Sequence, residues 1–276
     1  MRRSYWLPML CLILGGLIFA TAQNRISRVK RNQVNAEISV TLPLFIQVVL
    51  AGGDRYLAAS WAAIRALVTE TARMSRDEYR VLAEVQQDAS WLNPAHEDNY
   101  YIAAAILPWE GQLDPAQVTL RRATLARFYD YQPPFYYAFN LLHFKADGLA
   151  AAEWLRHAAP KLPNPDERLI MENYAARWLD RTDDLDLAAR IVDAMAAQTK
   201  RKDFADYLHM RSQRLRDLAL LRRTAIDYAN RHGAPPGDLA DLVQSGLLQK
   251  LPSDPLGFGF GLDPKGVPIL FNGPRQ

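Results

Sequence analysis

The chain has 276 residues, of which 49% are hydrophobic and 23% charged, so it can bury a core and lacks the composition of a disordered protein. Its 33 basic and 30 acidic residues are spread along the sequence, and the net charge of +3 predicts no nucleic-acid partner. A single cysteine, Cys11, excludes a disulfide framework within the chain and a zinc site built on cysteines.

Residues 1–24 are predicted to be a membrane anchor or a signal segment. Arg2 and Arg3 precede an uncharged run, residues 4–24, which at helical rise is long enough to cross the hydrocarbon core. This length favours a retained single-pass anchor. Cleavage after Ala22 stays open, because Ala20-Thr21-Ala22 fits a signal peptidase site. A basic linker is expected over residues 25–41.

Residues 42–76 are predicted to form an N-terminal helical hairpin. The first apolar run, LPLFIQVVLAGG, is too short to span a membrane. Asp54 is a plausible N-cap for the second helix, in which apolar side chains recur at helical spacing. This stripe indicates packed helices, and it consists of Leu57, Trp61, Ile64 and Val68.

Residues 77–206 contain an internal repeat. Residues 137–159 and 174–196 match at a constant shift that pairs Asp147 with Asp184 and Ala151-Ala152 with Ala188-Ala189. The same shift pairs Tyr137 with Tyr174 and Leu142 with Leu179. Each unit is expected to contain two helices joined by a polar turn. Proline-bearing breaks separate the units, at Asn93-Pro94, Pro133-Pro134 and Pro163-Asn164-Pro165.

Two segments of this region, ASWLNPAHEDNYYIAAAILPWEGQLDPA and LPNPDERLIMENYAARWLDRTDDLDLAARIVDAMA, resemble tetratricopeptide repeats. The whole chain is similar to membrane-anchored bacterial tetratricopeptide-like proteins of unassigned function. This resemblance implies a mainly α-helical fold, an α-solenoid of tetratricopeptide-like (TPR-like) hairpins. Together with the N-terminal segment, it predicts a single-pass protein of the bacterial inner membrane, with its body in the periplasm and protein partners in the cell envelope. If the segment is cleaved after Ala22, the body is secreted to the periplasm instead.

The stretch YYIAAAILPWE, residues 100–110, is predicted to form the first helix of a repeat, and this helix is expected to end near Leu107-Pro108. Its side chains Ile102, Ala105 and Ile106 are expected to pack inward. Aromatic residues are crowded between residues 100 and 144, beyond what two repeats need for their core. Aromatic side chains on a concave helical surface are effective anchors for a protein partner. The candidate partner-binding residues are Tyr100, Trp109, Tyr131 and Tyr136.

Residues 207–276 are predicted to be a long helix followed by a small module. The helix runs from Tyr207 to His232, and its apolar stripe is Leu218, Leu221, Ala225 and Tyr228. A short helix from Asp238 to Gly246 and a β-hairpin turning at residues 263–266 follow. This last region resembles part of the type II secretion pseudopilins. A component of a type II secretion or type IV pilus-like assembly is therefore an alternative function.

Motifs for chemistry are weak in this sequence. His96-Glu97 opens like a zinc-protease motif but has Tyr100 in place of the second histidine. The glycines of residues 257–261 fit a hairpin better than a phosphate loop, and calcium between Asp254 and Asp263 stays open. The acids at residues 183–186 are expected to cap a helix. We therefore expect no catalysis, cofactor or metal, and the main hypothesis is a scaffold or adaptor. An envelope enzyme without a recognisable motif is the second alternative.

Overall fold

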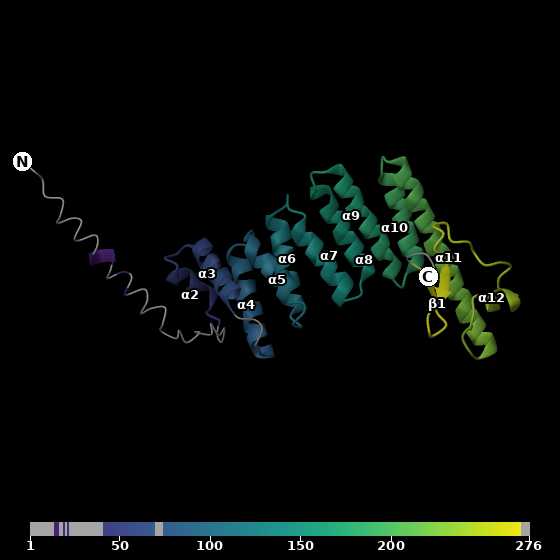
Figure 1. Ribbon diagram of the computed structural model, residues 1–276, viewed down its shortest axis with the longest axis horizontal. Helices are drawn as coiled ribbons and strands as arrows, with labels where there is room; N and C mark the ends of the chain where they lie inside the picture. Colours follow the sequence, from purple (N-terminus) through teal and green to yellow (C-terminus); the bar gives the residue numbers. More distant parts are fainter. Residues whose placement is uncertain (1–13, 17–18, 20, 22–40, 70–73, 272–276) are drawn as a thin grey trace, which may run out of the picture.

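The computed structural model describes residues 14–16, 19, 21, 41–69 and 74–271, over which the chain is mainly α-helical with one small antiparallel two-stranded sheet. The helices lie side by side in an elongated row (Figure 1). In chain order they are α2 (Leu44–Leu50), α3 (Arg55–Val68), α4 (Arg76–Leu92), α5 (Glu97–Ile106), α6 (Leu113–Ala126), α7 (Gln132–Phe144), α8 (Gly148–Ala158), α9 (Pro165–Trp178), α10 (Leu185–Gln198), α11 (Lys202–His232) and α12 (Ala240–Gln244). Short 3₁₀ turns, η2 (Ala159–Lys161) and η3 (Leu179–Arg181), extend α8 and α9.

The predicted membrane anchor over residues 1–24 and the linker after it lie almost entirely outside the described residues. Within the described part of the chain, no helix combines the length and the apolar character needed to cross a bilayer.

Several helix ends follow from local sequence signals. Asp54 caps α3 as predicted, because its carboxylate accepts hydrogen bonds from the backbone N–H groups of Tyr56 and Leu57. Ser75 and Glu78 form a capping box at the start of α4. The proline-bearing breaks lie between helices or in their first turns, where a proline costs no hydrogen bond; Pro165 is the first residue of α9.

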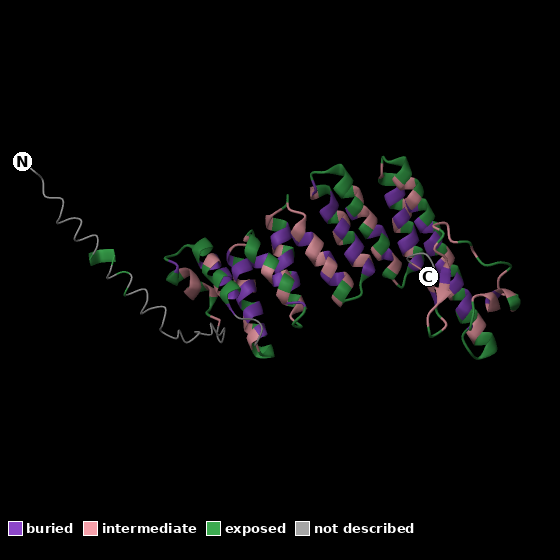
Figure 2. Ribbon diagram, in the orientation of Figure 1, coloured by how far each residue is buried: buried purple, intermediate pink, exposed green. Residues whose placement is uncertain are grey.

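Packing in the row is mostly between helices that are close in the sequence. α3 packs on α4, α5 on α6, α7 on both α6 and α8, and α8 on α9, while α4 also contacts α6. The buried residues run through the interior of the whole row instead of surrounding one centre (Figure 2). The largest cluster joins α7–α11 with the C-terminal segment, and smaller clusters lie among α2–α7.

The internal repeat matches structurally equivalent positions at the second helix of each unit. Asp147 caps α8 and Asp184 caps α10, each accepting a hydrogen bond of 2.9 Å from a backbone N–H three residues later. The paired alanines that follow each cap are buried. The match is weaker at the first helix, where Tyr174 is exposed and Tyr137 is half-buried. The structural similarity between the two units therefore lies in the caps and the small buried alanines of their second helices.

α2, α3 and α4 pack together as expected, but the large apolar stripe of α3 is not its packing face. Leu57, Trp61, Ile64 and Val68 are all exposed, whereas the buried face of α3 consists of Ala58, Ala59, Ala62, Ala63 and Ala66. Alanines let the α3 backbone approach α4 closely, so the alanine face is buried and the stripe of larger apolar side chains stays exposed.

The C-terminal segment folds as predicted into a long helix, a short helix and a β-hairpin. α11 begins at Lys202, before the expected Tyr207, and ends at Gly233 in a left-handed conformation. Strands β1 (Phe260–Leu262) and β2 (Pro268–Leu270) pair in antiparallel register, with Phe260 opposite Leu270. The segment is fastened to α11 by Arg214, whose guanidinium pairs with Asp254 at 3.0 Å and donates to the carbonyl of Phe271.

Candidate functional site

An apolar groove lies between α5 and α7. Its lining residues are mostly aromatic or small, it has a volume of about 270 Å³, and it opens to solvent through the exposed Tyr101. The ring of Tyr136 meets the ring of Tyr101 edge to face, with centroids 5.9 Å apart, and Phe135 packs against Tyr136 at 5.6 Å. The lining consists of Tyr101, Ala104 and Ala105 from α5 and of Phe135, Tyr136, Phe139 and Asn140 from α7.

The register of α5 decides which of its residues line the groove. Tyr100, Ala103 and Leu107 are buried, and Tyr101, Ala104 and Ala105 occupy the adjacent stripe at three- and four-residue spacing. The predicted inward set of α5 is therefore right only in part, because Ile106 packs against a core cluster. Ala105 is exposed in the groove, and Ile102 and Ile106 are only half-buried.

A hydrogen-bonded network at one end of the groove holds α5 to the loop before α7; we call it the Tyr100 network. The Tyr100 hydroxyl donates to Oδ2 of Asp130 at 2.9 Å and lies 3.1 Å from Oε1 of Gln132. Arg127 donates to the same Asp130 oxygen at 2.8 Å and pairs with Glu97 at the start of α5. The network thus connects the first turn of α5 to the start of α7.

Burial and hydrogen bonding set the protonation of this network. Burial raises the pKa of Tyr100 well above its usual value, and the Asp130 carboxylate adds to the rise. Burial would also raise the pKa of Asp130, but the Gln132 N–H, the Arg127 guanidinium and the Tyr100 hydroxyl together hold that pKa below its usual value. At neutral pH the network therefore combines a neutral phenol, a carboxylate and a guanidinium.

Buried side-chain amides fix α7, which forms one wall of the groove, to α6. Asn140 donates from Nδ2 to Oε1 of Gln117 at 3.2 Å, and Gln117 donates from Nε2 to the carbonyl of Tyr137. These bonds connect α7 to α6, which packs on α5 as well. The groove is consequently built on helices fixed at both sides and offers apolar contact area without a charged side chain in its lining.

The four predicted partner-binding residues are dispersed. Tyr136 lines the groove, whereas Tyr100 is buried beside it with its hydroxyl engaged and offers a partner no surface. Tyr131 is half-buried and packs against the large core cluster. Trp109 is exposed in the turn after α5, with its ring 5.0 Å from both His143 and Phe144 at the far end of α7.

Tyr101, Phe135 and Phe139 are the groove residues that the sequence prediction missed. The usable signal was the helical register of α5, since Tyr100, Ala103 and Leu107 form one stripe and Tyr101, Ala104 and Ala105 form the next. Which of the two stripes is buried depends on the helix that α5 packs against, and the sequence alone does not identify that helix.

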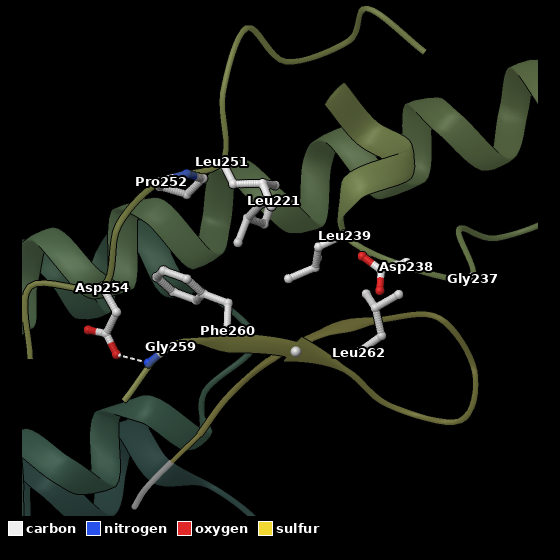
Figure 3. A pocket seen from close by; sticks show the side chains of 11 residues that line it. Leu221, Gly237, Asp238, Leu239, Leu251, Pro252, Asp254, Gly259, Phe260 and Leu262 are labelled. Atoms are coloured by element: carbon white, nitrogen blue, oxygen red, sulfur yellow. Dashed lines mark hydrogen bonds between the residues drawn. The ribbon is translucent and has the colours of Figure 1, made fainter. Parts of the chain in front are cut away.

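A second cavity, of about 540 Å³, lies between α11 and the C-terminal segment. Figure 3 shows Phe260 and Leu239 at its centre and the carboxylate of Asp254 bonded to the Gly259 N–H at one side. Asp254 is also paired with the buried Arg214, and Asp263 accepts the N–H groups of Lys265 and Val267. Both proposed calcium ligands are thus engaged in holding the hairpin, so the groove is the better candidate site.

The remaining weak motifs have structural surroundings. Within residues 41–69 and 74–271, the side chains include no group of three or more His, Cys, Asp or Glu residues that could hold a metal ion. Asp184 caps α10, and Asp186 forms an exposed ion pair with Arg223. Gly261 lies in β1 against the Phe271 ring, so the glycine-rich stretch is part of a hairpin, as expected.

Comparison of the chain with protein-family models, with curated proteins and with solved structures finds no match in any of the three.

Proposed function

We propose that the protein is a non-catalytic, membrane-tethered scaffold or adaptor of a bacterial cell-envelope complex, which binds an apolar segment of a protein partner in the groove between α5 and α7. In this proposal the helical row is a TPR-like α-solenoid, residues 4–24 anchor it in the inner membrane, and its body lies in the periplasm.

The observation that carries the proposal is the combination of aromatic and alanine side chains in a groove with uncharged lining. Tyrosine and phenylalanine provide large, stiff contact surfaces that lose little entropy on binding. The Tyr136 hydroxyl is neutral at physiological pH, as that of a tyrosine ordinarily is, and burial raises its pKa further, so it can donate a hydrogen bond. An extended or helical segment with an aromatic or aliphatic side chain is the ligand that such a lining accommodates.

Tethering would act together with the groove. A partner in the same envelope compartment meets a membrane-anchored groove at a raised effective concentration, so weak contacts in a small groove suffice for assembly. The proposal therefore requires no very high affinity of the isolated groove.

Site-specific photo-crosslinking of the full chain in cells tests the proposal. The photoreactive amino acid p-benzoylphenylalanine replaces Tyr101 in the groove, and in a matched control it replaces Tyr174, another exposed tyrosine, on α9. We expect one discrete protein adduct from position 101 and none from position 174. The adduct should disappear when Ala105→Arg places a long charged side chain in the groove.

The absence of an adduct at position 101, or the same adducts at both positions, would refute the proposed groove. A discrete adduct formed instead from position 251, next to the C-terminal cavity, would favour the alternative of a secretion or pilus-like assembly component.

A further inference from the structure

The outward surface of α2 and α3 is almost entirely apolar; we call it the α2–α3 face. Phe45 and Val49 of α2 are 67% and 69% exposed, and Trp61 and Ile64 of α3 are 50% and 55% exposed. A shallow cavity lined by both Leu50 and Trp61 shows that the two helices contribute to one surface. Its further exposed members are Leu50, Tyr56, Leu57, Leu67 and Val68.

The face is exposed because α3 packs inward through its alanines, which leaves the larger apolar side chains accessible to solvent. Charge on the two helices is of one sign: α2 has none, and α3 carries Arg55 and Arg65 with no acidic residue. Arg55 donates to the carbonyl of Leu92 at 2.6 Å, which holds its guanidinium beside the end of α4. The exposed side chains of the face itself are uncharged, and the charged groups around it include Arg65 and the N-cap Asp54 of α3 and Asp88 of α4, which accepts from Gln47 of α2. An apolar helical face with arginine beside it matches helices that lie in the headgroup region of a membrane.

The α2–α3 face lies at an end of the row, where an exposed apolar surface is unusual. α2 and α3 form one end of the row, and at the other end α11 is covered by the hairpin and α12 (Figure 1). End units of a helical stack normally present a polar outer surface. Large contiguous apolar patches on a protein surface mark interaction sites. The α2–α3 face therefore has the composition of a contact surface at a place where a polar cap is expected.

The sequence before α2 indicates what that contact is. Residues 4–24 are uncharged and long enough to cross a bilayer, and Arg25, Arg28, Lys30 and Arg31 follow within the short stretch that leads to α2. Basic residues beside a membrane segment attract anionic headgroups. We propose that the α2–α3 face rests on the lipid surface, with its aromatic and aliphatic side chains inserted at the headgroup level.

This contact would orient the protein as well as attach it. With α2 and α3 against the bilayer, the row leaves the membrane from one end, and α5 to α11 follow at increasing distance along it (Figure 1). The inference rests on the proposed membrane tether and is independent of the proposed partner groove.

A depth measurement with the full chain tests the proposal. Because Cys11 is the single cysteine, Cys11→Ser creates a cysteine-free background for a nitroxide at Ile64→Cys. The matched control is Ile226→Cys, an equally apolar and exposed position on α11 (61%). Both chains are reconstituted into phosphatidylethanolamine and phosphatidylglycerol vesicles. Collision of each nitroxide with oxygen, which enters lipid, and with a water-soluble nickel chelate is then measured by electron paramagnetic resonance.

We expect the ratio of oxygen to nickel collisions to be several times higher at position 64 than at position 226. A water-exposed label at position 64 on a vesicle-bound chain would overturn the inference and leave the tether intact. A label shielded from both reagents, or dipolar broadening that vanishes when unlabelled chain is added, would overturn it in favour of a protein cover or a second copy. A chain that stays in the supernatant would overturn tether and inference together.

Discussion

The side chains of Tyr100 and Tyr101 lie on different stripes of α5 and have different surroundings. Tyr100 is buried and donates to Asp130, and Tyr101 is exposed at the mouth of the groove. Asp130 is the central residue of the Tyr100 network, because it accepts from Tyr100, from Arg127 and from the backbone N–H of Gln132. Hydrogen bonds to a charged acceptor are stronger than those between neutral groups.

Replacing Asp130 tests this network at the scale of one residue. At neutral pH we expect Asp130→Asn to lower the free energy of unfolding by about 1–3 kcal/mol, because charge-assisted bonds are lost while their partners stay buried. The pKa of Asp130 is lowered in the folded state, so its stabilisation is present above the unfolded pKa near 4 and is lost as the pH falls through the lower folded value.

The urea midpoint of the wild-type chain should accordingly fall more steeply between pH 5 and pH 3 than that of Asp130→Asn. Asp227→Asn, at an exposed carboxylate on α11, is the control and should keep the wild-type slope. Parallel pH profiles for wild type and Asp130→Asn would contradict the role given to the network.

At the scale of the elements, the joint between one hairpin and the next depends on close backbone contact. The first residue of α8, Gly148, lies against the end of α9, where a Cβ atom added to it would come within 2.5 Å of the Trp178 carbonyl oxygen. A backbone oxygen cannot move aside as a flexible side chain can. This contact explains why a glycine follows the Asp147 cap of α8, although a leucine, Leu185, follows the equivalent cap of α10.

Gly148→Ala should therefore destabilise the chain, although alanine is the better helix former. We expect a loss of about 1–3 kcal/mol, the usual cost of overpacking, measured by urea unfolding followed by circular dichroism. Gly237→Ala is the matched control, because its Cβ would meet only the Asp241 carboxylate at an ordinary 3.7 Å. Equal stability of Gly148→Ala and wild type would show that the α8–α9 joint tolerates an added methyl group.

At the scale of the whole molecule, the far end of the row is closed by a segment that returns onto α11. Arg214 and Asp254 are each only 2% exposed in this contact. The Phe258 ring lies 5.6 Å from the guanidinium, and Arg222 donates to the carbonyl of Pro268. A buried ion pair adds little net stability over an apolar pair, but removing one partner leaves an uncompensated charge.

Arg214→Met should release the C-terminal segment while the rest of the row stays folded. We expect a local cost of about 3–5 kcal/mol, seen as faster hydrogen exchange of residues 235–271. Arg223→Met is the control, since the same residue type on the same helix forms an exposed pair with Asp186. A uniform change in exchange along the whole chain would instead show that the segment and the row unfold together.

Local signals in the sequence determined the helical class, the positions of several helix ends, the equivalent caps Asp147 and Asp184, and the C-terminal hairpin. Each depends on interactions within a few residues, such as a carboxylate accepting backbone N–H groups or a proline in a first turn.

Only the tertiary structure decided which face of a helix is buried. On α3 the stripe of Leu57, Trp61, Ile64 and Val68 and the stripe of alanines are both apolar and helically spaced, and close approach to α4 selected the alanines. On α5 the same ambiguity placed Tyr100 in the core and Tyr101 in the groove. Hydrophobic periodicity identifies apolar stripes, but when a helix has two of them, the shape of the neighbouring helix determines which one is buried.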